Sequence, residues 1–438
     1  MKNLKSKIYI KTFGCQMNSY DSDRILESIQ HSHAAVSSAD QADVIVFNTC
    51  HIRERAAEKI YSEVGMLKEL KENNKDLKLI ITGCVAQAEG QAMIRRQPMI
   101  DAIIGPQMYH EFPKVLSEIK DKRVIKLDFE NDQKFKKLKA KRTLSNISSF
   151  VTIQEGCDKF CSFCVVPFTR GSEFSRRSQD IYDEVSNLVK QGCKEITLLG
   201  QNVNAYHGLN KDNKEVNIAK LIAELENIPE LNRITYTTSH PRDMNDELIN
   251  LHNRSVKLNS YLHLPVQSGS DAILKAMNRG YTAKDYLNIV NKVRRNCPDI
   301  ALSSDFIIGF PGESRSDFKK TIELVKEVNF AQAYSFKYSS RPGTKSSRIK
   351  SDNICVEESN DRLHEIQEIL NKQQRLFNNK FLSKKVEVLV KGKGKKKDQY
   401  RGTTKWMQVV NFTSQDPVNL LEMVNLTKVS NNSILGEV

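Results

Sequence analysis

Three cysteines stand close together in the run EGCDKFCSFC, spaced as Cys157-x3-Cys161-x2-Cys164. We call this set the loop triplet. No fourth cysteine lies nearby, so three thiolates could bind three irons of a 4Fe-4S cluster and leave the fourth iron open. A structural zinc site needs four ligands, and ferredoxin-type electron transfer normally uses four cysteines. An open iron can instead chelate the amino and carboxylate groups of a substrate, so the spacing favours a catalytic iron–sulfur site.

Three further cysteines each end a β-branched run, at residues 7–15, 42–50 and 77–84. A fourth apolar run follows at 100–105, and helical patterns at about 21–30 and 53–72 separate the earlier ones. Strand–helix alternation predicts a parallel sheet, in which ligands bind at the carboxyl ends of the strands. Cys15, Cys50 and Cys84, which we call the sheet triplet, would then converge on one edge. Three buried structural cysteines are the alternative.

A second and longer series of strands and helices must position the loop triplet, which directly follows its first strand. The strand-like runs lie at 150–154, 195–199, 233–237, 261–265, 300–308 and 333–338. Helical patterns separate them, at about 180–190, 218–225, 246–251, 271–277 with 283–295, and 316–328. Six β/α units are fewer than the eight of a complete barrel. We therefore expect an open, partial (β/α)6 barrel.

Short β-like runs fill the last part of the chain, after a long polar helix at about 357–382. They lie at 386–390, 408–412, 420–426 and 433–438. This pattern predicts a small antiparallel β-barrel, an architecture that oligonucleotide-binding modules often use. The fold class is thus α/β with three domains, at residues 5–122, 143–375 and 376–438. A lysine-rich interdomain linker is predicted over 120–148.

The charge of the 438-residue chain is concentrated in two segments. Its net charge is +14; residues 120–142 hold 10 Lys/Arg against 4 Asp/Glu, and residues 376–438 hold 11 against 5. Such an excess suits a polyanionic partner, or else a solvated linker and tail. No run approaches the roughly 20 apolar residues of a membrane span, and no signal peptide begins the chain, so a cytoplasmic protein without a membrane partner is expected. Nine cysteines argue against a disulfide framework.

The loop triplet, with Phe163 just before its last cysteine, resembles the signature of radical S-adenosylmethionine (SAM) enzymes. Other runs extend the resemblance: LGQNVN from Leu199, HLPVQSG from His263, DFIIGFPGE from Asp305, and KTFGCQMN, NTCHIRERAAEK and VVPFTRGSEFSR. Together they are similar to the methylthiotransferases. The resemblance covers nearly the whole chain, including a C-terminal part like the TRAM domain. NTCHIRERAAEK is most similar to the branch that acts on N6-isopentenyladenosine in tRNA.

This resemblance implies a reaction with two 4Fe-4S clusters and two SAM molecules. The loop triplet would hold the cluster that cleaves SAM, and the sheet triplet an auxiliary cluster. One SAM molecule would methylate a sulfur on the auxiliary cluster, and the other would yield the radical that abstracts hydrogen from C2 of the adenine. The implied product is 2-methylthio-N6-isopentenyl(dimethylallyl)adenosine at position 37, 3′ of the anticodon. The implied partners are tRNA, an external electron donor and a sulfur source that the residues do not identify, with a single chain as the acting unit.

Two other functions compete with this one. Within the family, the substrate could be threonylcarbamoyl-adenosine in tRNA or an aspartate of a ribosomal protein. In another class, the chain could be an RNA-binding protein whose clusters are structural or redox-sensing. The intact loop triplet and the motifs at later strand ends favour the enzyme.

The resemblance also implies cofactor-binding residues at the strand ends, and no catalytic residue beyond the cluster ligands. Phe163 would flank the adenine of SAM, and Gly200 and Gln201 would meet its methionine part. Four more would face the same mouth: Gln267, Gly269, Gly309 and Glu313. Tight strand-to-helix turns are the alternative explanation of each glycine.

Several remaining residues are expected to be structural. His240 and His263 have no local ligand partner, and Trp406 is expected in a core, although an exposed Trp406 could stack on a base. Arg341 could meet RNA or form a surface salt bridge. The basic run 391–397 could follow phosphates. Cysteines outside the triplets are expected to be packing residues: Cys193, Cys297 and Cys355.

Overall fold

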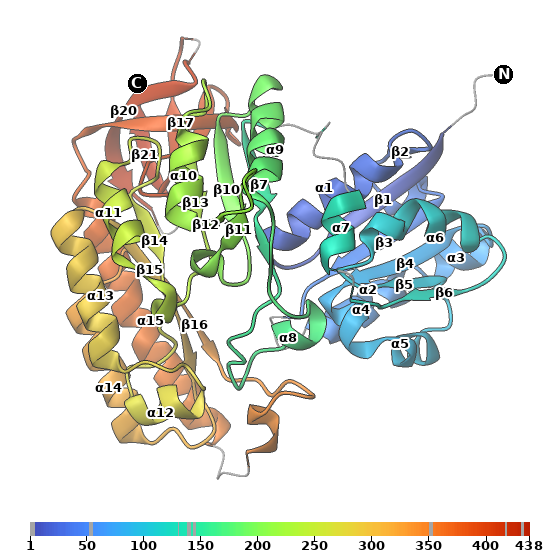
Figure 1. Cartoon of the computed structure of the whole chain (residues 1–438), viewed down its shortest axis with the longest axis horizontal. Helices are drawn as coiled ribbons and strands as arrows, with labels where there is room; N and C mark the ends of the chain where they lie inside the picture. Colours follow the sequence, from blue (N-terminus) through green and yellow to red (C-terminus); the bar gives the residue numbers. More distant parts are fainter. Residues whose placement is uncertain are drawn as a thin grey trace.

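The computed structural model describes residues 5–51, 56–129, 131–137, 142, 146–349, 354–416, 418–430 and 433–438. It has three parts (Figure 1): an N-terminal domain on the right, a partial barrel in the centre and left, and a C-terminal barrel at the upper left. No helix among these residues combines the length and the apolar character needed to cross a membrane.

The N-terminal domain is a six-stranded parallel sheet between two layers of helices. Its strand order is β2-β1-β3-β4-β5-β6. The strands are β1 (Ser6–Thr12), β2 (His33–Ala35), β3 (Val44–Thr49), β4 (Lys78–Gly83), β5 (Ala102–Ile104) and β6 (Val124–Lys126). Side chains of β3 alternate between two apolar clusters, one on each face of the sheet. One cluster lies under α1 (Gln16–Ile29) and α6 (Phe112–Glu118). The other lies under α2 (Ala56–Met66), α4 (Cys84–Glu89) and α5 (Gln91–Arg96). Burial on both faces explains the continuous apolar runs of these strands.

Six parallel strands form the partial barrel, as predicted. They are β7 (Ser148–Thr152), β10 (Glu195–Leu199), β13 (Arg233–Tyr236), β14 (Tyr261–His263), β15 (Ala301–Ile308) and β16 (Gln332–Lys337). Two three-stranded sheets meet where Ile234 and Leu258 form a bridge between β13 and the approach to β14. In the part of the chain that the structure describes, β16 does not pair with β7, so the barrel stays open.

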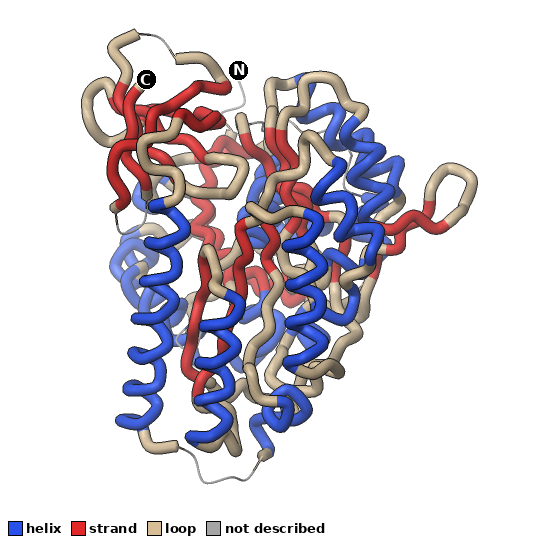
Figure 2. Tube along the Cα trace, turned by 90° about the vertical axis from the view of Figure 1, so that its left-hand side faces the viewer, coloured by secondary structure: helices blue, strands red, loops and turns tan. Residues whose placement is uncertain are grey.

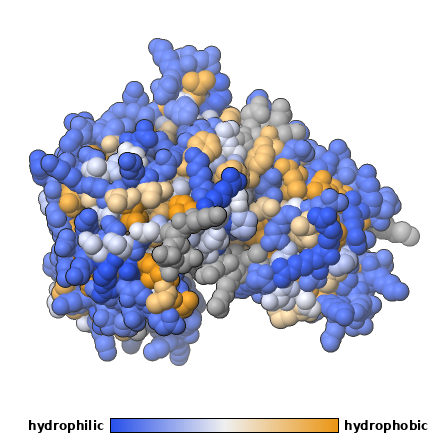
Figure 3. Space-filling view, turned by 90° about the horizontal axis from the view of Figure 1, so that it is seen from below, coloured by the Kyte–Doolittle hydropathy of each residue, from blue (hydrophilic) through white to orange (hydrophobic). Residues whose placement is uncertain are grey.

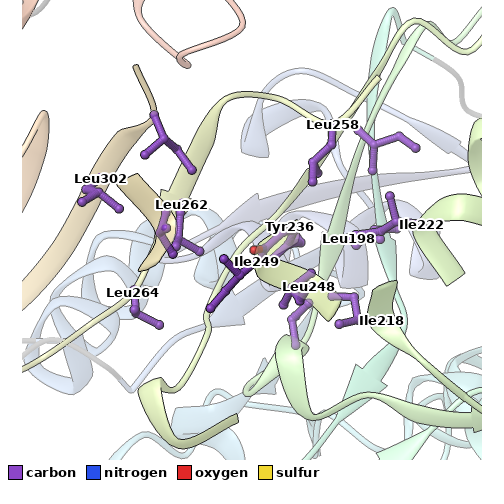
Figure 4. Close-up of a cluster of buried hydrophobic side chains, with 14 of the residues drawn as sticks. Leu198, Ile218, Ile222, Tyr236, Leu248, Ile249, Leu258, Leu262, Leu264 and Leu302 are labelled. Atoms are coloured by element: carbon purple, nitrogen blue, oxygen red, sulfur yellow. The ribbon is translucent and has the colours of Figure 1, made fainter. Parts of the chain in front are cut away.

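Helices on the outside of the partial barrel cover its strands with a continuous apolar core. They are α9 (Ser178–Lys190), α10 (Ile218–Glu226), α11 (Asp246–Arg254), α13 (Ala283–Asn296) and α14 (Arg315–Val328), whereas α12 (Asp271–Ala276) packs in a separate small cluster with Phe310. Figure 2 shows the helices standing beside the strands, and Figure 4 shows the packing of Leu198, Ile222 and Tyr236 with Leu248 and Ile249. This core holds the inner face of the barrel in place.

Helix α15 (Val356–Asn379) packs on β16 and leads into the closed C-terminal barrel. The barrel order is β17-β18-β19-β21-β20, and only the β19–β21 pair is parallel. Its strands are β17 (Lys385–Lys393), β18 (Gln399–Thr403), β19 (Val409–Thr413), β20 (Leu421–Val429) and β21 (Ile434–Glu437). The predicted fold class is confirmed, although the sequence pattern missed β18.

The C-terminal barrel is attached to the amino ends of the partial-barrel strands. Lys391 pairs with the buried Glu195 at 2.5 Å, and Arg233 donates to the Thr403 carbonyl at 2.5 Å and pairs with Glu387 at 3.1 Å. Lys391, at the start of the basic run, is therefore engaged within the protein.

The predicted interdomain linker over 120–148 contains regular structure that its lack of periodicity did not indicate. Residues 124–126 form the edge strand β6, and Asn131–Lys137 form helix α7. Lys134 is fully buried and pairs with Glu155 at 2.6 Å, while Arg142 pairs with Glu27 at 2.8 Å and Glu184 at 3.1 Å. A pattern of charges without periodicity resembled a solvated segment, but two of its cations are buried between the domains.

Candidate active site

The sheet triplet lies where three neighbouring strands end. Cys15 is the N-cap of α1 after β1, Cys50 directly follows β3, and Cys84 is the first residue of α4 after β4. Gly14 and Gly83 precede two of these cysteines with φ of +101° and +93°, a conformation that favours glycine. A Cβ on Gly14 would also lie 2.7 Å from the Cys50 sulfur. The glycine thus permits the close approach of the two loops.

The thiols of the sheet triplet interact. A hydrogen bond from Cys50 is the main cause that lowers the pKa of Cys15 to about 6, with a further contribution from the positive charge of Arg170. Burial raises the pKa of Cys84, and the charge of Cys15 adds to that effect. The prediction that the three strands bring their cysteines to one edge agrees with these placements.

Arg170 links this triplet to the partial barrel. Its side chain is 3% exposed. It pairs with Asp21 at 2.8 Å and Glu155 at 2.5 Å, and its positive charge opposes the rise that burial causes in the pKa of the Cys84 thiol. Helix α4, which begins with Cys84, packs on α8 (Val166–Thr169), which follows the loop triplet. The two cysteine triplets are therefore held next to each other.

The loop triplet lies between β8 (Gln154–Glu155) and α8. The Val166 amide donates to the Cys164 sulfur at 3.4 Å, and Arg279 donates to the Cys161 sulfur at 3.4 Å. Burial, together with the charge of Cys161, raises the pKa of Cys157 to about 11 and that of Cys164 to about 12. Such thiols stay protonated near neutral pH unless a metal displaces their protons.

Both triplets fit an iron–sulfur cluster better than a single metal ion. Within the described residues, no three His, Cys, Asp or Glu side chains gather as one ion would require. In a 4Fe-4S cluster each thiolate binds a different iron, so the sulfurs do not converge on one point. Each triplet offers only thiolates, the soft donors that iron–sulfur clusters use. Within each triplet the thiols affect one another's pKa, which places them at short range.

A cavity of about 1330 Å³ lies between the N-terminal domain and the partial barrel. Cys15, Cys50 and Lys59 line it from the N-terminal domain. From the barrel and the loop triplet it is lined by Phe163, His263, Gln267, Asp305, Ile307, Tyr334, Phe336 and Arg341, among others. In the view from below (Figure 3), small hydrophobic patches lie among hydrophilic side chains on this side of the molecule. One cavity therefore meets residues of both triplets or their immediate neighbours.

The inner face of the barrel contributes an aromatic pair to this cavity. Tyr334 and Phe336 lie two residues apart on the edge strand β16 and therefore share one face. They are 46% and 44% exposed and line the cavity. The neighbouring strand places Asp305 opposite Tyr334 and Ile307 opposite Phe336. His263 lies 3.0 Å from the Ser303 hydroxyl and 3.5 Å from Asp305. Although His263 was expected to be structural only, it lines the cavity.

Of the seven predicted cofactor-binding residues, Phe163 and Gln267 line the cavity. Gly200 and Gln201 instead brace the cysteine loop. A Cβ on Gly200 would lie 2.5 Å from Gln154, and the Gln201 side chain accepts from the Gly156 amide at 2.6 Å. Their cofactor roles stay predictions.

The other three predicted residues support later strand ends. Gly269 packs so closely on α14 that a Cβ would lie 2.5 Å from the Lys320 carbonyl. The Gly309 amide donates to Glu313 at 2.8 Å, and the buried Glu313 pairs with Arg362 at 3.0 Å. These roles also remain predictions.

The residues expected to be structural had different outcomes. His240 is buried, and burial followed by the charge of Arg279 lowers its pKa to about 2. Cys193 is buried in the apolar core of the partial barrel and Cys297 packs against it, as expected for packing residues. The prediction that Cys355 is a packing residue is wrong. Cys355 is exposed, and its sulfur accepts from the Glu358 amide as the N-cap of α15. Trp406 packs on Phe381 with ring centroids 4.4 Å apart.

Sequence reasoning missed Arg170, Arg279, Tyr334 and Phe336. Arg170 lies in the quoted motif VVPFTRGSEFSR, but neither arginine has a periodic pattern that would show its contact with a distant cysteine. Tyr334 and Phe336 alternate along a predicted strand, which could have indicated a shared face. Residues 52–55 of NTCHIRERAAEK lie outside the described residues.

Comparison with known proteins adds family information. Residues 7–105 match the model of "Uncharacterized protein family UPF0004", and residues 151–325 match the Radical SAM superfamily. The chain is 49% identical over 409 residues to the tRNA-2-methylthio-N(6)-dimethylallyladenosine synthase of Roseobacter denitrificans, covering 92% of each chain. It is 46% identical over 445 residues to the protein of the same name from Rickettsia canadensis, covering 99% of this chain and 100% of the relative.

Solved structures share the fold at low sequence identity. The radical SAM methyltransferase TsrM from Kitasatospora setae has a TM-score of 0.56 at 11% identity, over 78% of this chain and 74% of its own. The cobalamin-dependent radical SAM enzyme OxsB has a TM-score of 0.51 at 13% identity, over 84% of this chain and 56% of its own. These similarities support the arrangement of the elements alone.

Proposed function

We infer the activity of this chain from the premise that it belongs to the family of the tRNA-2-methylthio-N6-dimethylallyladenosine synthases. It is a radical SAM methylthiotransferase that modifies C2 of N6-dimethylallyladenosine, at position 37 of tRNA. The observation that supports this most directly is a cavity lined by residues from both sides of the site. One wall carries Cys15 and Cys50 of the sheet triplet, and the opposite wall carries Phe163, the neighbour of Cys164 in the loop triplet.

The loop triplet holds the 4Fe-4S cluster of the radical SAM reaction, and the sheet triplet holds a second cluster. Bound there, the first cluster together with SAM would supply the radical chemistry needed to take hydrogen from an aromatic carbon, which acid–base groups cannot deprotonate usefully. The fit of three thiolates at each of two neighbouring sites supports the count of two.

The protein's own side chains bind and orient the nucleoside. Tyr334 and Phe336 offer exposed rings on which bases can stack, and Ile307 extends this apolar surface toward an N6-dimethylallyl group. Lys59 and Arg341 line the same cavity and can meet phosphates.

The remaining assignments follow from the substrate and the site. A tRNA substrate supports a cytoplasmic location. One chain supplies both triplets and both walls of the cavity, so a monomer is sufficient. Reduction of a cluster consumes one electron, and the proposed source is an external one-electron donor.

The test is anaerobic reconstitution followed by incubation with SAM, dithionite and tRNA that carries N6-dimethylallyladenosine. Mass spectrometry should detect the 2-methylthio nucleoside. Cys157→Ala should abolish both the nucleoside and 5′-deoxyadenosine, whereas Cys50→Ala should abolish the nucleoside and leave 5′-deoxyadenosine. Cys355→Ala, at an exposed helix cap, is the matched control and should retain both products. Modification of threonylcarbamoyl-adenosine in parallel samples, without modification of dimethylallyladenosine, would show the substrate assignment to be wrong.

A further inference from the structure

Each cysteine triplet has one buried arginine whose charge acts on one of its cysteines. Arg279 follows α12, is 5% exposed and donates to the Cys161 sulfur at 3.4 Å. Arg170 is 3% exposed, and its positive charge opposes the rise that burial causes in the pKa of the Cys84 thiol. Both guanidinium groups are thus fixed beside a ligand position of one cluster.

The two arginines differ in their other partners. Arg170 pairs with Asp21 and Glu155, and Lys134 also pairs with Glu155 at 2.6 Å. Two cations and two carboxylates therefore balance each other next to the sheet triplet.

The partners of Arg279 are neutral. Its Nη2 donates to the Pro265 carbonyl at 2.6 Å, and its Nε donates to the Tyr281 hydroxyl at 2.9 Å. It forms no ion pair with a carboxylate anywhere in the described ranges of the chain. The nearby Lys159 is already paired, with Asp243 at 2.7 Å. The loop triplet therefore lies beside a buried positive charge that no carboxylate compensates.

An uncompensated buried cation favours reduction of a neighbouring cluster. Reduction adds one negative charge, which a nearby cation stabilises more strongly in a low-dielectric interior than in water. Hydrogen bonds to the cluster sulfurs act in the same direction. The charge of Arg170, by contrast, is offset by its ion pairs with Asp21 and Glu155.

We propose that Arg279 makes the cluster at the loop triplet the more easily reduced of the two, so that an incoming electron resides where SAM binds. The inference rests on the two clusters of the proposed function and adds an order to their reduction. One electron from an external one-electron donor, dithionite in the test, reduces one cluster. Arg279 is a positioning residue that acts through Cys161 and does not touch the reacting nucleoside.

The first test is a redox titration of the full reconstituted chain, followed by EPR. Addition of SAM identifies the cluster that binds it, because chelation at the open iron changes its spectrum. In the unaltered chain, the SAM-responsive cluster should be reduced at the higher potential. Reversed or equal potentials overturn the proposal without any substitution.

The second test changes the arginine. Arg279→Gln removes the charge and keeps an amide that can donate to Pro265. The equilibrium constant for reduction of the SAM-responsive cluster should fall at least tenfold, which lowers its reduction potential by about 59 mV for one electron. The potential of the other cluster should not shift. Arg279→Lys, which keeps the charge, should recover part of the difference.

Arg294→Gln is the matched control. Arg294 is half-buried, and like Arg279 it donates to backbone carbonyls, in this case those of Val328 and Asn329. These residues belong to neither triplet. Its loss should leave both potentials unchanged. An Arg279→Gln chain with normal iron content and an unshifted potential contradicts the proposal, as does an equal shift of both clusters. A chain that loads only one cluster contradicts the proposed function as well. A chain that loads two clusters and cleaves SAM normally, but in which the SAM-responsive cluster is reduced second, contradicts this inference alone.

Discussion

The Lys134 ammonium lies 2.6 Å from the Glu155 carboxylate, and both side chains are fully buried. Lys134 belongs to the segment between the domains, and Glu155 directly precedes the loop that carries Cys157. Arg170 binds the other oxygen of Glu155 and also Asp21 of α1. This ion-pair network holds the N-terminal domain against the partial barrel, and with it the two cysteine triplets.

Lys134→Met should destabilise the protein by about 3 kcal/mol, because removal of one partner leaves a buried carboxylate incompletely compensated. The midpoint of urea denaturation, followed by circular dichroism, measures the effect. Lys137→Met is the control on the same helix. Lys137 is half exposed and pairs with Glu111 at the surface, so its loss should cost less than about 1 kcal/mol. Equal midpoints for the two variants would exclude a stabilising role of the buried pair.

Gly14→Ala should prevent assembly of the cluster at the sheet triplet. A Cβ at this position would strike Cys50, and φ is already +101°. We expect iron per chain to fall by about half and 5′-deoxyadenosine formation to persist. Gly192→Ala is the matched control, since Gly192 also has φ of +101° but no atom within 4 Å of the added Cβ. If both variants lose iron alike, backbone strain alone is the cause.

Tyr334→Ala should weaken the use of tRNA without reducing SAM cleavage in the absence of RNA. Stacking of one base on an aromatic ring contributes about 1–3 kcal/mol, which corresponds to a roughly 5- to 150-fold increase in KM for tRNA. Steady-state formation of the modified nucleoside measures KM. Tyr334→Phe keeps the ring and should retain the normal KM; a KM raised as much as in the Ala variant would assign the effect to the hydroxyl instead.

Stability should fall between pH 6.5 and pH 4 through His252. Burial lowers its pKa to about 4, below the ordinary value of about 6.5, so the unfolded chain binds more protons in this window and acid favours unfolding. At pH 5 this amounts to about 2 kcal/mol relative to pH 7. The difference in urea midpoint between pH 7 and pH 5 should be smaller in His252→Phe. An unchanged difference would mean that His252 titrates normally.

Prediction from sequence succeeded where the physical cause is local. Alternating and continuous apolar runs gave the six strands of the partial barrel and four of the six strands of the N-terminal sheet, where the short edge strands β2 and β6 were missed. Cysteines at strand ends indicated a shared edge. Strand β18 was missed because its residues, QYRGT, are mostly polar. Long-range partners could not be found in this way, because Arg170 meets Asp21 across 149 residues and Arg279 meets Cys161 across 118.

The attachment of the C-terminal barrel through Lys391 and Glu195 fixes the distance between this barrel and the cavity. The exposed lysines of its β17–β18 hairpin lie beyond the amino ends of the strands, whereas the cavity opens toward their carboxyl ends. An eight-residue strand such as β15 alone spans roughly 26 Å. An RNA that contacts both places must bridge at least this length, which a rigid stem next to the modified loop can do. Selection by length would then operate alongside recognition of the nucleoside itself.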